Sequence, residues 1–280
     1  MKIVLVTFFL LSNMVSISQV NRDAIFKSMD GLIKSNSAPI KNKEKKLDNL
    51  NGKVKFIIED YYTLNGEKIE RPGLKVPGNC YKYWYSKEGQ LIRRQNYFDT
   101  VIYSDEFFLY KKGLLNQVIL KTKSGRTDSI NYTYNNNGFL IKEEKFYNGK
   151  TSRKKVFNYD NSGRLSQEFE FGDGFNSVAR SDYRYSKNQL DSIIHLNGRT
   201  VFTYYLNGLL KQKTIGYPDN IFPTLYKYDN HSNIVEESLP TLKATYRFDY
   251  EYDKQLNWIS KYDYSGGKLM SIIKRTIEYY

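Results

Sequence analysis

Few residues of this chain have the types and spacings from which catalytic or metal sites are built. The two histidines, His195 and His231, and the single cysteine, Cys80, leave too few ligands for a zinc site, and no internal disulfide can form. The sequence contains no Gly-x-Ser-x-Gly, phosphate-loop or His-Glu-x-x-His motif. We therefore expect no catalytic residues, no metal and no cofactor, and a function that is not enzymatic.

Two kinds of catalytic pair stay open from the sequence alone. Cys80 with either histidine would form a nucleophile and its base, although nothing in the sequence places them together. Carboxylates from different strands could also meet. Adjacent carboxylates such as Glu143 and Glu144 are poor partners, because neighbours on a strand face opposite ways.

Aromatic side chains are the residues whose chemistry points to a ligand. The chain holds 26 Tyr, 16 Phe and 2 Trp, and its formal net charge is +13. Aromatic rings stack on sugar faces and cations attract acidic groups, so carbohydrate or another anionic surface ligand is the expected partner. Trp84 and Trp258 are the candidate ligand contacts. Most tyrosines are expected to be core, and most lysines to cover the polar face of a sheet.

The first residues have the pattern of a signal peptide. Lys2 precedes the apolar run 3–11, and Ser16 and Ser18 stand at the −3 and −1 positions of a cleavage before Gln19. We expect a signal peptide at 1–18, an N-terminal helix and linker at 19–50, and a Tyr-rich repeat domain at 51–280. The mature chain has no second apolar segment of spanning length. We expect it to be exported, to the periplasm, the medium or the cell surface of a bacterium, and not to span a membrane.

A repeated phrase organises the chain after residue 80. An aromatic residue, any residue and Tyr are followed by a short polar stretch, Gly or Asn, any residue and Leu, and successive copies are 20 to 26 residues apart. Asp160, Asp229 and Asp253 follow the Tyr of their copies and are expected to cap the turns. The repeat positions are Tyr85, Tyr110, Gly113, Tyr134, Gly138, Leu140, Tyr159, Gly163, Leu165, Tyr185, Tyr205, Gly208, Tyr228 and Tyr252.

Each copy predicts two strands and two turns. Tyr-x-Tyr places two rings on one face of a strand, Gly permits the positive φ of a tight turn, and Leu opens the return strand. The fold class expected is all-β, a long antiparallel meander of tandem ~24-residue β-hairpin repeats with a short N-terminal helix at 21–34. The sheet could close into a barrel-like shell, fold over as two layers or be covered by the helix. The segment 273–280 predicts a last strand whose charges protect an open edge.

One copy resembles a known repeat. Tyr159-Asp160-Asn161-Ser162-Gly163-Arg164-Leu165 matches the YD-repeat pattern of the rearrangement hot spot (Rhs) family, and the copies that begin at Tyr228 and Tyr252 resemble it more loosely. The chain looks like the short exported YD-type proteins of Bacteroidetes. The resemblance implies a long sheet that spirals into a shell, with carbohydrate binding or cell-surface contact. The chain lacks the family's Asp-Pro-x-Gly-Leu junction and a toxin domain, so the toxin-enclosing role is not expected.

Two functions follow as expectations. The first is a non-enzymatic binding or scaffold protein of the bacterial envelope, with carbohydrate as its ligand. The alternative is a protein-partner binder, such as a toxin inhibitor or immunity-type protein, because a broad repeat sheet with a charged face suits docking. Charge and aromatic content would also permit nucleic-acid binding, but export argues against it.

Overall fold

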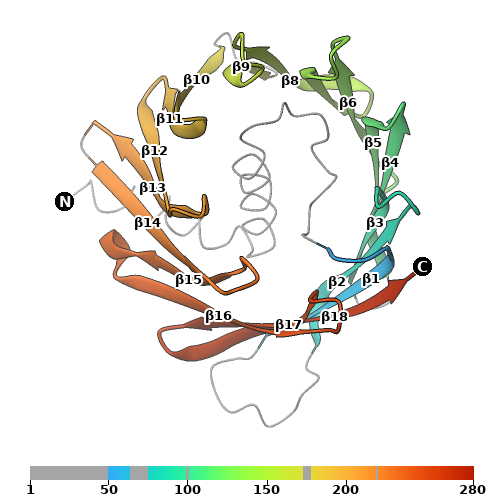
Figure 1. Cartoon of the computed structure of the whole chain (residues 1–280). Coiled ribbons are helices and arrows are strands. Elements are labelled where there is room, and N and C mark those ends of the chain that lie inside the picture. The colour runs from blue at the N-terminus through green and yellow to red at the C-terminus, as the bar shows by residue number, and fades with distance from the viewer. Residues whose placement is uncertain (1–49, 64–74, 99–100, 173–177, 219) are drawn as a thin grey trace, which may run out of the picture.

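The computed structural model describes residues 50–63, 75–98, 101–172, 178–218 and 220–280. The signal peptide and the N-terminal helix predicted from the sequence lie outside these residues. The described part is all-β, and its strands form one closed antiparallel barrel (Figure 1). Apart from strands, it contains one short 3₁₀ helix, η1 (Pro240–Leu242). None of the described residues belongs to a helix long and apolar enough to cross a membrane.

The 18 strands follow one another around the barrel in chain order. They are β1 (Val54–Thr63), β2 (Lys75–Tyr85), β3 (Leu91–Phe98), β4 (Val101–Lys111), β5 (Leu114–Thr122), β6 (Thr127–Tyr134), β7 (Leu140–Tyr147), β8 (Lys150–Tyr159), β9 (Leu165–Gly172), β10 (Ala179–Ser186), β11 (Gln189–His195), β12 (Gly198–Tyr204), β13 (Leu210–Tyr217), β14 (Asn220–Tyr228), β15 (Ile234–Leu239), β16 (Ala244–Tyr252), β17 (Trp258–Ser265) and β18 (Lys268–Tyr279).

The barrel closes where the last strand pairs with the first. β18 is antiparallel to β1 over its length, with Tyr61 opposite Ile273 and Val54 opposite Tyr279. The meander expected from the sequence is present in this coarse form, and of the three arrangements left open the chain adopts the closed one. The expectation of an open edge at 273–280 was wrong, because β18 is hydrogen-bonded to β17 on one side and to β1 on the other. Closure leaves these backbone groups paired, so the charges there protect no edge.

The repeated phrase forms the same local structure in copy after copy. The Tyr that ends one strand is paired with the Leu that opens the next, as in Tyr134 with Leu140 and Tyr159 with Leu165. The register shifts just before each of these tyrosines, because the return strand carries an extra residue after its Leu. Gly138, with φ of 79°, occupies the left-handed position of the turn that joins them.

Two copies are aligned differently from the sequence prediction. Tyr204, not Tyr205, is paired with Leu210, so Tyr205 is the first residue of its turn. In the last copy Leu256, not Asn257, has the positive φ that glycine has elsewhere. The turn between paired strands therefore has more uniform length than the sequence suggested.

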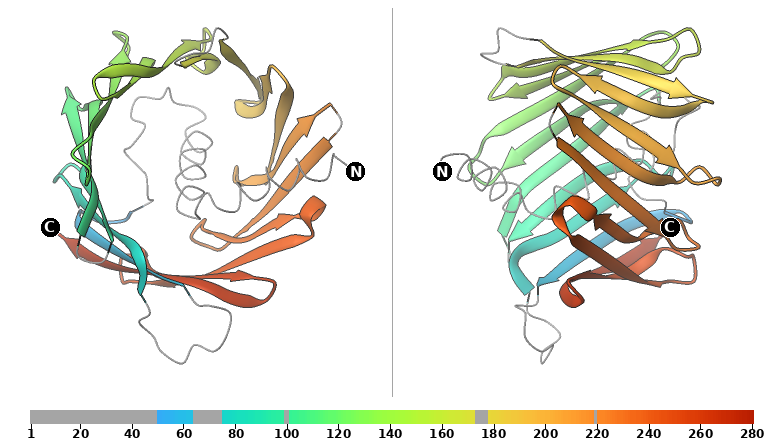
Figure 2. Two further views of the ribbon diagram at one scale, coloured as in Figure 1. Left: turned by 180° about the vertical axis from the view of Figure 1, so that it is seen from behind. Right: turned by 90° about the vertical axis from the view of Figure 1, so that its left-hand side faces the viewer.

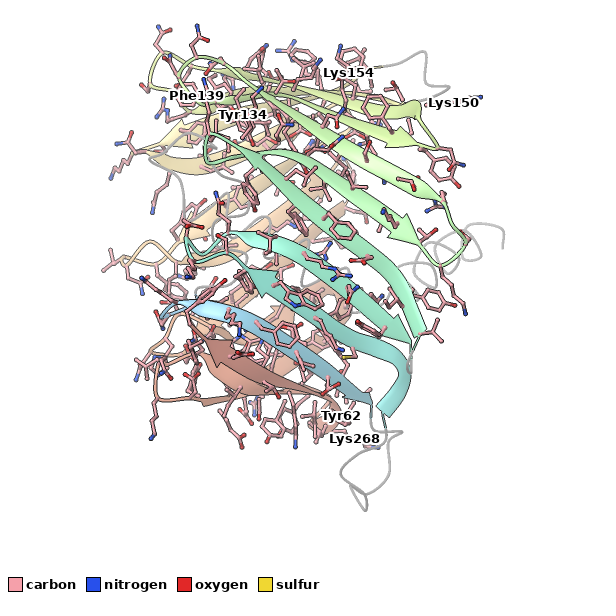
Figure 3. The ribbon with its side chains drawn as sticks, turned by 90° about the vertical axis from the view of Figure 1, so that its right-hand side faces the viewer. Tyr62, Tyr134, Phe139, Lys150, Lys154 and Lys268 are labelled. Carbon is pink, nitrogen blue, oxygen red and sulfur yellow. The ribbon has the colours of Figure 1, made fainter. Side chains whose placement is uncertain are left out.

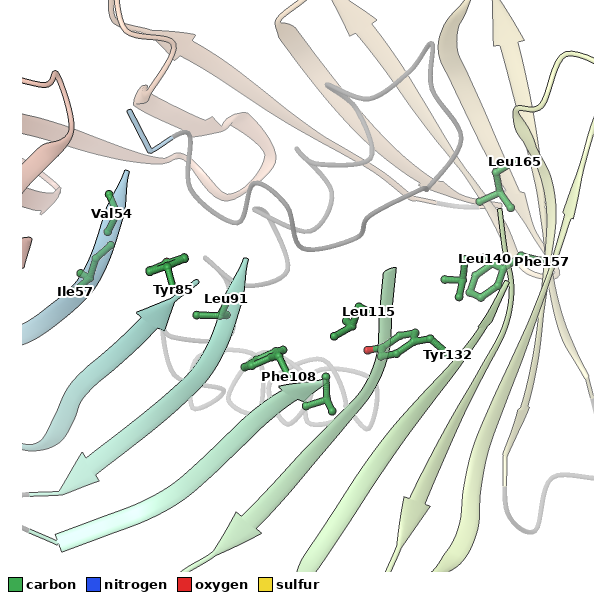
Figure 4. Close-up of a cluster of buried hydrophobic side chains, with 11 residues drawn as sticks. Val54, Ile57, Tyr85, Leu91, Phe108, Leu115, Tyr132, Leu140, Phe157 and Leu165 are labelled. Atoms are coloured by element: carbon green, nitrogen blue, oxygen red, sulfur yellow. The ribbon is translucent and has the colours of Figure 1, made fainter. Parts of the chain in front are cut away.

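The inner face of the barrel holds the hydrophobic core. Side chains of the repeat, such as Tyr85, Leu91, Leu140, Phe157 and Leu165, are buried in one cluster (Figure 4). A second cluster, which includes Leu190, Phe202 and Tyr226, continues it around the wall. Residues that are paired across two strands lie on the same face of the sheet, and the next residue along each strand lies on the other face. The pairing register therefore shows which side chains point into the barrel and which point outward.

The two ends of the barrel differ in the turns they carry, and both are seen edge-on in Figure 2 (right). We call the end that carries the Tyr–Gly–Leu turns the tyrosine rim; it contains Tyr134 and Phe139 (Figure 3). We call the other end, which contains Lys150 and the short connections such as Asn148-Gly149, the opposite rim. The tyrosine rim belongs to the repeat, whereas the connections of the opposite rim vary in sequence.

Candidate ligand-binding surface

A row of aromatic and cationic side chains crosses the outer face of β1 to β4. Phe56 is paired with Trp84, Trp84 with Arg93, and Arg93 with Phe107. Phe108, the neighbour of Phe107, is buried in the inner core, so this row must face outward. The pairing therefore brings together four side chains that lie far apart in the sequence.

Arg93 is the centre of this row. Its guanidinium lies 5.0 Å from the ring centroid of Trp84 and 5.3 Å from that of Phe107. It also donates two hydrogen bonds to Asp105, from Nε to Oδ1 at 2.9 Å and from Nη2 to Oδ2 at 2.7 Å. The guanidinium is in contact with two aromatic rings, and its edge is hydrogen-bonded to a carboxylate. Its position is therefore fixed before any ligand binds.

A second row of polar side chains lies beside the first on the same face. Gln95 donates to Asp105 from Nε2 at 2.9 Å and accepts from the Tyr97 hydroxyl at 2.5 Å. Lys82 lies 4.3 Å above the ring of Tyr97. We call the two rows together the aromatic platform, which comprises Phe56, Lys82, Trp84, Arg93, Gln95, Tyr97, Asp105 and Phe107.

The electrostatics of the aromatic platform keep its carboxylate charged. Partial burial by itself would raise the pKa of Asp105, but hydrogen bonds from Arg93 and Gln95 outweigh it and lower that pKa below its usual value. The same hydrogen bond to Asp105 raises the pKa of Arg93. Both groups are therefore ionised at neutral pH and keep their geometry.

Exposure decides which groups could touch a ligand. The side chain of Arg93 is 37% exposed and that of Asp105 is 16% exposed, whereas Gln95 is almost wholly buried. Phe56 and Trp84 are half-buried, with ring centroids 5.0 Å apart. The accessible surface therefore consists of ring faces and edges beside a guanidinium, which suits a flat, hydroxyl-bearing or acidic ligand.

The second predicted contact, Trp258, lies elsewhere. It occupies the Leu position of its copy, paired with Tyr252, and the Arg275 guanidinium lies 3.3 Å from its ring centroid. Arg275 is buried and is paired with Glu59 on the inner face of β1. The two tryptophans therefore lie on opposite faces of the wall and are not brought together.

The Arg275–Glu59 pair joins the last strand, β18, to the first, β1. Arg275 donates to Glu59 Oε1 from Nε at 2.7 Å and Nη2 at 2.5 Å, across the β1–β18 pairing that closes the barrel. Glu59 Oε2 accepts from the hydroxyls of Tyr61 and Tyr83 at 2.9 and 3.0 Å. Loss of either partner would leave the other charge buried and unpaired, so this hydrogen-bonded pair is a structural group of the closing strands, and Trp258 packs against it.

The reactive residues considered from the sequence are not assembled into a catalytic group. Cys80 lies on β2, whereas His195 lies on β11 and His231 in the turn after β14, and these strands are not neighbours. His195 Nδ1 is 2.9 Å from Ser181 Oγ. Burial lowers the pKa of His195, with Glu168 opposing the shift. Among the described residues, no group of three His, Cys, Asp or Glu could hold a metal ion.

Sequence reasoning singled out Trp84 but not the side chains that it meets in the structure. Arg93 and Phe107 gave no signal, because each stands next to a similar residue, Arg94 or Phe108, that faces the other way. The extra residue after Leu91 decides that Arg93 and not Arg94 points outward, and a bulge of this kind is not visible in the spacing.

Comparisons with known proteins give likeness in structure but not in sequence. No protein-family model matches the chain, and no curated protein matches it. Similar solved structures include porin-like proteins from Bacteroides uniformis ATCC 8492 (12% identity, 82% of this chain and 98% of that chain, TM-score 0.45) and Bacteroides vulgatus ATCC 8482 (12%, 81% and 98%, 0.34).

A third similar structure is TcdB2-TccC3 without its hypervariable C-terminal region. The identity is 12%, the match covers 78% of this chain and 16% of that chain, and the TM-score is 0.36. This chain thus spans a small part of the TcdB2-TccC3 chain.

Proposed function

We propose that the protein is an exported, non-enzymatic barrel of the bacterial envelope that binds carbohydrate on its aromatic platform. The observation that carries the proposal is the arrangement of Trp84 and Phe107 on either side of Arg93, with Asp105 fixing the guanidinium. Rings offer stacking faces for a sugar, and the guanidinium donates to hydroxyl or carboxylate oxygens beside them. Acidic sugars fit this combination best, because the cation adds an attraction that neutral sugars lack.

The outer face of β16 supports a barrel that stands in water. Barrels that cross membranes place apolar residues outward and polar residues inward. β16 does the reverse: Thr245, Arg247, Asp249 and Glu251 are exposed, and its tyrosines and Phe248 are half-buried. Tyr246 is on the inner face, since it is joined through Glu237 to buried Tyr226 by direct pairing. A charged wall of this kind would be costly in lipid.

The turns of the tyrosine rim support the YD-type assignment. Asp160 Oδ1 accepts from the backbone N–H groups of Ser162 and Arg164, both at 2.9 Å, and Asp229 and Asp253 cap their turns in the same way. These are the caps expected of an Asp that follows Tyr. They give the Tyr-Asp pair a structural purpose in the turns of the barrel.

A glycan array followed by calorimetry tests the carbohydrate proposal. We expect the exported protein to bind acidic glycans, and Trp84→Ala to weaken that binding by about tenfold, the loss of one stacking contact of about 1–2 kcal/mol. Phe169→Ala is the matched control, because Phe169 lies on β9 with Arg180 at 5.9 Å from its ring centroid, away from the platform.

Three results would count against this function. They are an array without any hit, equal loss of affinity in both variants, and binding that survives Trp84→Ala unchanged. The melting temperature of each variant separates a lost contact from a lost fold.

A protein partner is the second candidate function. Ile92 and Leu109 are exposed on the outer wall next to the aromatic platform, and apolar groups bordered by charged ones are common at protein interfaces. An inhibitor or immunity-type role would require a partner that co-purifies with the exported protein and is released by Leu109→Asp. If glycans bind and no partner co-purifies, this second function fails.

A further inference from the structure

The aromatic platform continues onto β5 through one lysine. Lys121 is paired with Asp105 across β4 and β5, and its ammonium lies 5.5 Å from the ring centroid of Phe107. Because paired residues share a face of the sheet, Lys121 is on the outer face with Asp105, and it is exposed there. Phe107 therefore lies between two cations, Arg93 on β3 and Lys121 on β5.

The two cations differ in the charge that they leave for a ligand. Arg93 is ion-paired with Asp105, so that pair has no net charge, although only two of the five donors of the guanidinium are used in it. Lys121 forms no ion pair with any residue that the structure describes, and its printed contact is with the Phe107 ring. With every connection counted, the chain from residue 51 to 128 holds 14 Lys and Arg against 9 Asp and Glu. The charge of Lys121 is therefore not cancelled by its surroundings.

The separation of the two cations sets the separation of the anions that they could bind. Arg93 and Lys121 lie on strands that are both neighbours of β4. Adjacent strands are about 4.8 Å apart, so β3 and β5 are about 10 Å apart. A sugar of an extended glycan advances the chain by about as much as one strand spacing. Acidic groups held at Arg93 and at Lys121 would thus belong to sugars that are two positions apart.

The strand between the cations selects the sugar between the acids. The side chains that β4 turns outward at this level are Phe107 and Asp105. The Phe107 ring offers a face on which a sugar can stack. The Asp105 carboxylate, which accepts hydrogen bonds from Arg93 and Gln95, would repel a carboxylate placed beside it. The middle sugar should therefore be neutral.

We propose that the aromatic platform and Lys121 together bind a linear acidic polysaccharide that crosses β2 to β5 and carries an acidic group on every second sugar. One acidic group meets the Arg93 guanidinium beside Trp84, the next sugar stacks on Phe107, and the second acidic group meets Lys121. This inference rests on the carbohydrate function proposed above and specifies its ligand. It adds a subsite at Lys121 that a sugar with a single acidic group cannot fill.

Calorimetry with hyaluronan oligosaccharides tests the subsite at Lys121, because glucuronate alternates with neutral N-acetylglucosamine in this polymer. We expect the tetrasaccharide, which has two carboxylates, to bind about tenfold more tightly than the disaccharide, which has one. Lys121→Ala should remove this tenfold gain and leave the affinity for the disaccharide unchanged, whereas Trp84→Ala should weaken the binding of both. The gain should also shrink as salt is added, because Lys121 is exposed.

A matched lysine and a second acidic glycan provide the controls. Lys154 lies 5.9 Å from the ring centroid of Phe171, on β8 and β9, so Lys154→Ala removes the same kind of cation–ring pair from another part of the wall. This variant should bind both oligosaccharides as the parent does. Tetragalacturonate has a carboxylate on every sugar, and it should bind more weakly than the hyaluronan tetrasaccharide because one carboxylate would face Asp105.

Four results would overturn this ligand and leave a carbohydrate function in place. They are equal affinities of the parent for the disaccharide and the tetrasaccharide, equal losses for both lengths in Lys121→Ala, binding of tetragalacturonate as tight as that of the hyaluronan tetrasaccharide, and acidic glycans bound on the array without binding of either hyaluronan oligosaccharide. An array on which no acidic glycan binds would instead remove the carbohydrate function itself. The two failures are therefore distinguishable.

Discussion

The tyrosine rim and the opposite rim are two ends of the same strands, yet they are built in different ways. At the tyrosine rim, Tyr110 donates to the Leu91 carbonyl at 2.9 Å and Tyr159 to the Leu140 carbonyl at 2.7 Å, so each hydroxyl reaches the copy before it. Tyr252 reaches Asp229 and Tyr279 reaches Asp253 in the same direction. The tyrosine rim is a chain of contacts between copies.

The opposite rim has few contacts of this kind among its described residues. Its described connections range from the two-residue turn at Asn148-Gly149 to η1, and they leave large apolar side chains in solvent. The comparison shows that hydroxyl contacts between successive copies of the repeat are concentrated at one end of the barrel. Among the described residues, the connections at the other end differ from one another in length and sequence.

The largest expected difference between the rims concerns leucines. Leu140 is fully buried beside the tyrosine rim, whereas Leu242 is exposed at the opposite rim. Leu140→Ala should lower the free energy of unfolding by about 2–5 kcal/mol, because it removes a core contact and leaves a cavity. Leu242→Ala should change it by less than about 0.5 kcal/mol. Denaturant unfolding of both variants measures these changes. An equal loss of unfolding free energy in the two variants would remove the distinction between a rim that stabilises the fold and a rim that does not.

A smaller difference is expected for tyrosine hydroxyls. Tyr159→Phe removes the donor to the Leu140 carbonyl and should cost about 1 kcal/mol of unfolding free energy, the usual net value of one hydrogen bond. Tyr217→Phe at the opposite rim is the control, and its effect should lie within experimental error. A cost for Tyr217→Phe as large as that for Tyr159→Phe would contradict the view that hydroxyl contacts belong to one end.

Much of the architecture could be predicted from the sequence, because the information is local. Alternating rings, left-handed glycines and Asp caps each act within one turn of chain, as the strand end at Tyr159, the cap at Asp160 and the positive φ of Gly163 do here. A spacing of Tyr-x-x-x-Gly also fixes where one strand ends and the next begins. These features define the hairpins but not the number that fits around a ring.

Closure and the candidate site depend on contacts that no local pattern encodes. Glu59 and Arg275 are 216 positions apart, and the sequence around either residue gives no signal that the two are paired. The aromatic platform depends on the bulge after Leu91, which turns Arg93 outward and Arg94 inward. Trp258 was predicted as a candidate ligand contact together with Trp84, but its position in the repeat is that of an inward Leu.

The smallest expected signal is an alkaline titration of the tyrosine rim. Burial raises the pKa of Tyr185 to about 12, with the charge of Asp160 adding to the shift, and burial together with a hydrogen bond to Asp253 raises the pKa of Tyr279 to about 12. A phenol whose folded pKa lies above its unfolded value of about 10 stabilises the fold fully below pH 10. That contribution is lost as the pH rises from about 10 through 12.

Phenolate absorbance of the folded protein should therefore lag behind that of the denatured chain across this range. Tyr185→Phe should remove about one residue's share of the lag, out of 26 tyrosines. If folded and denatured chains titrated together, the rings of the tyrosine rim would be open to water, and the contrast between the two ends would rest on packing alone.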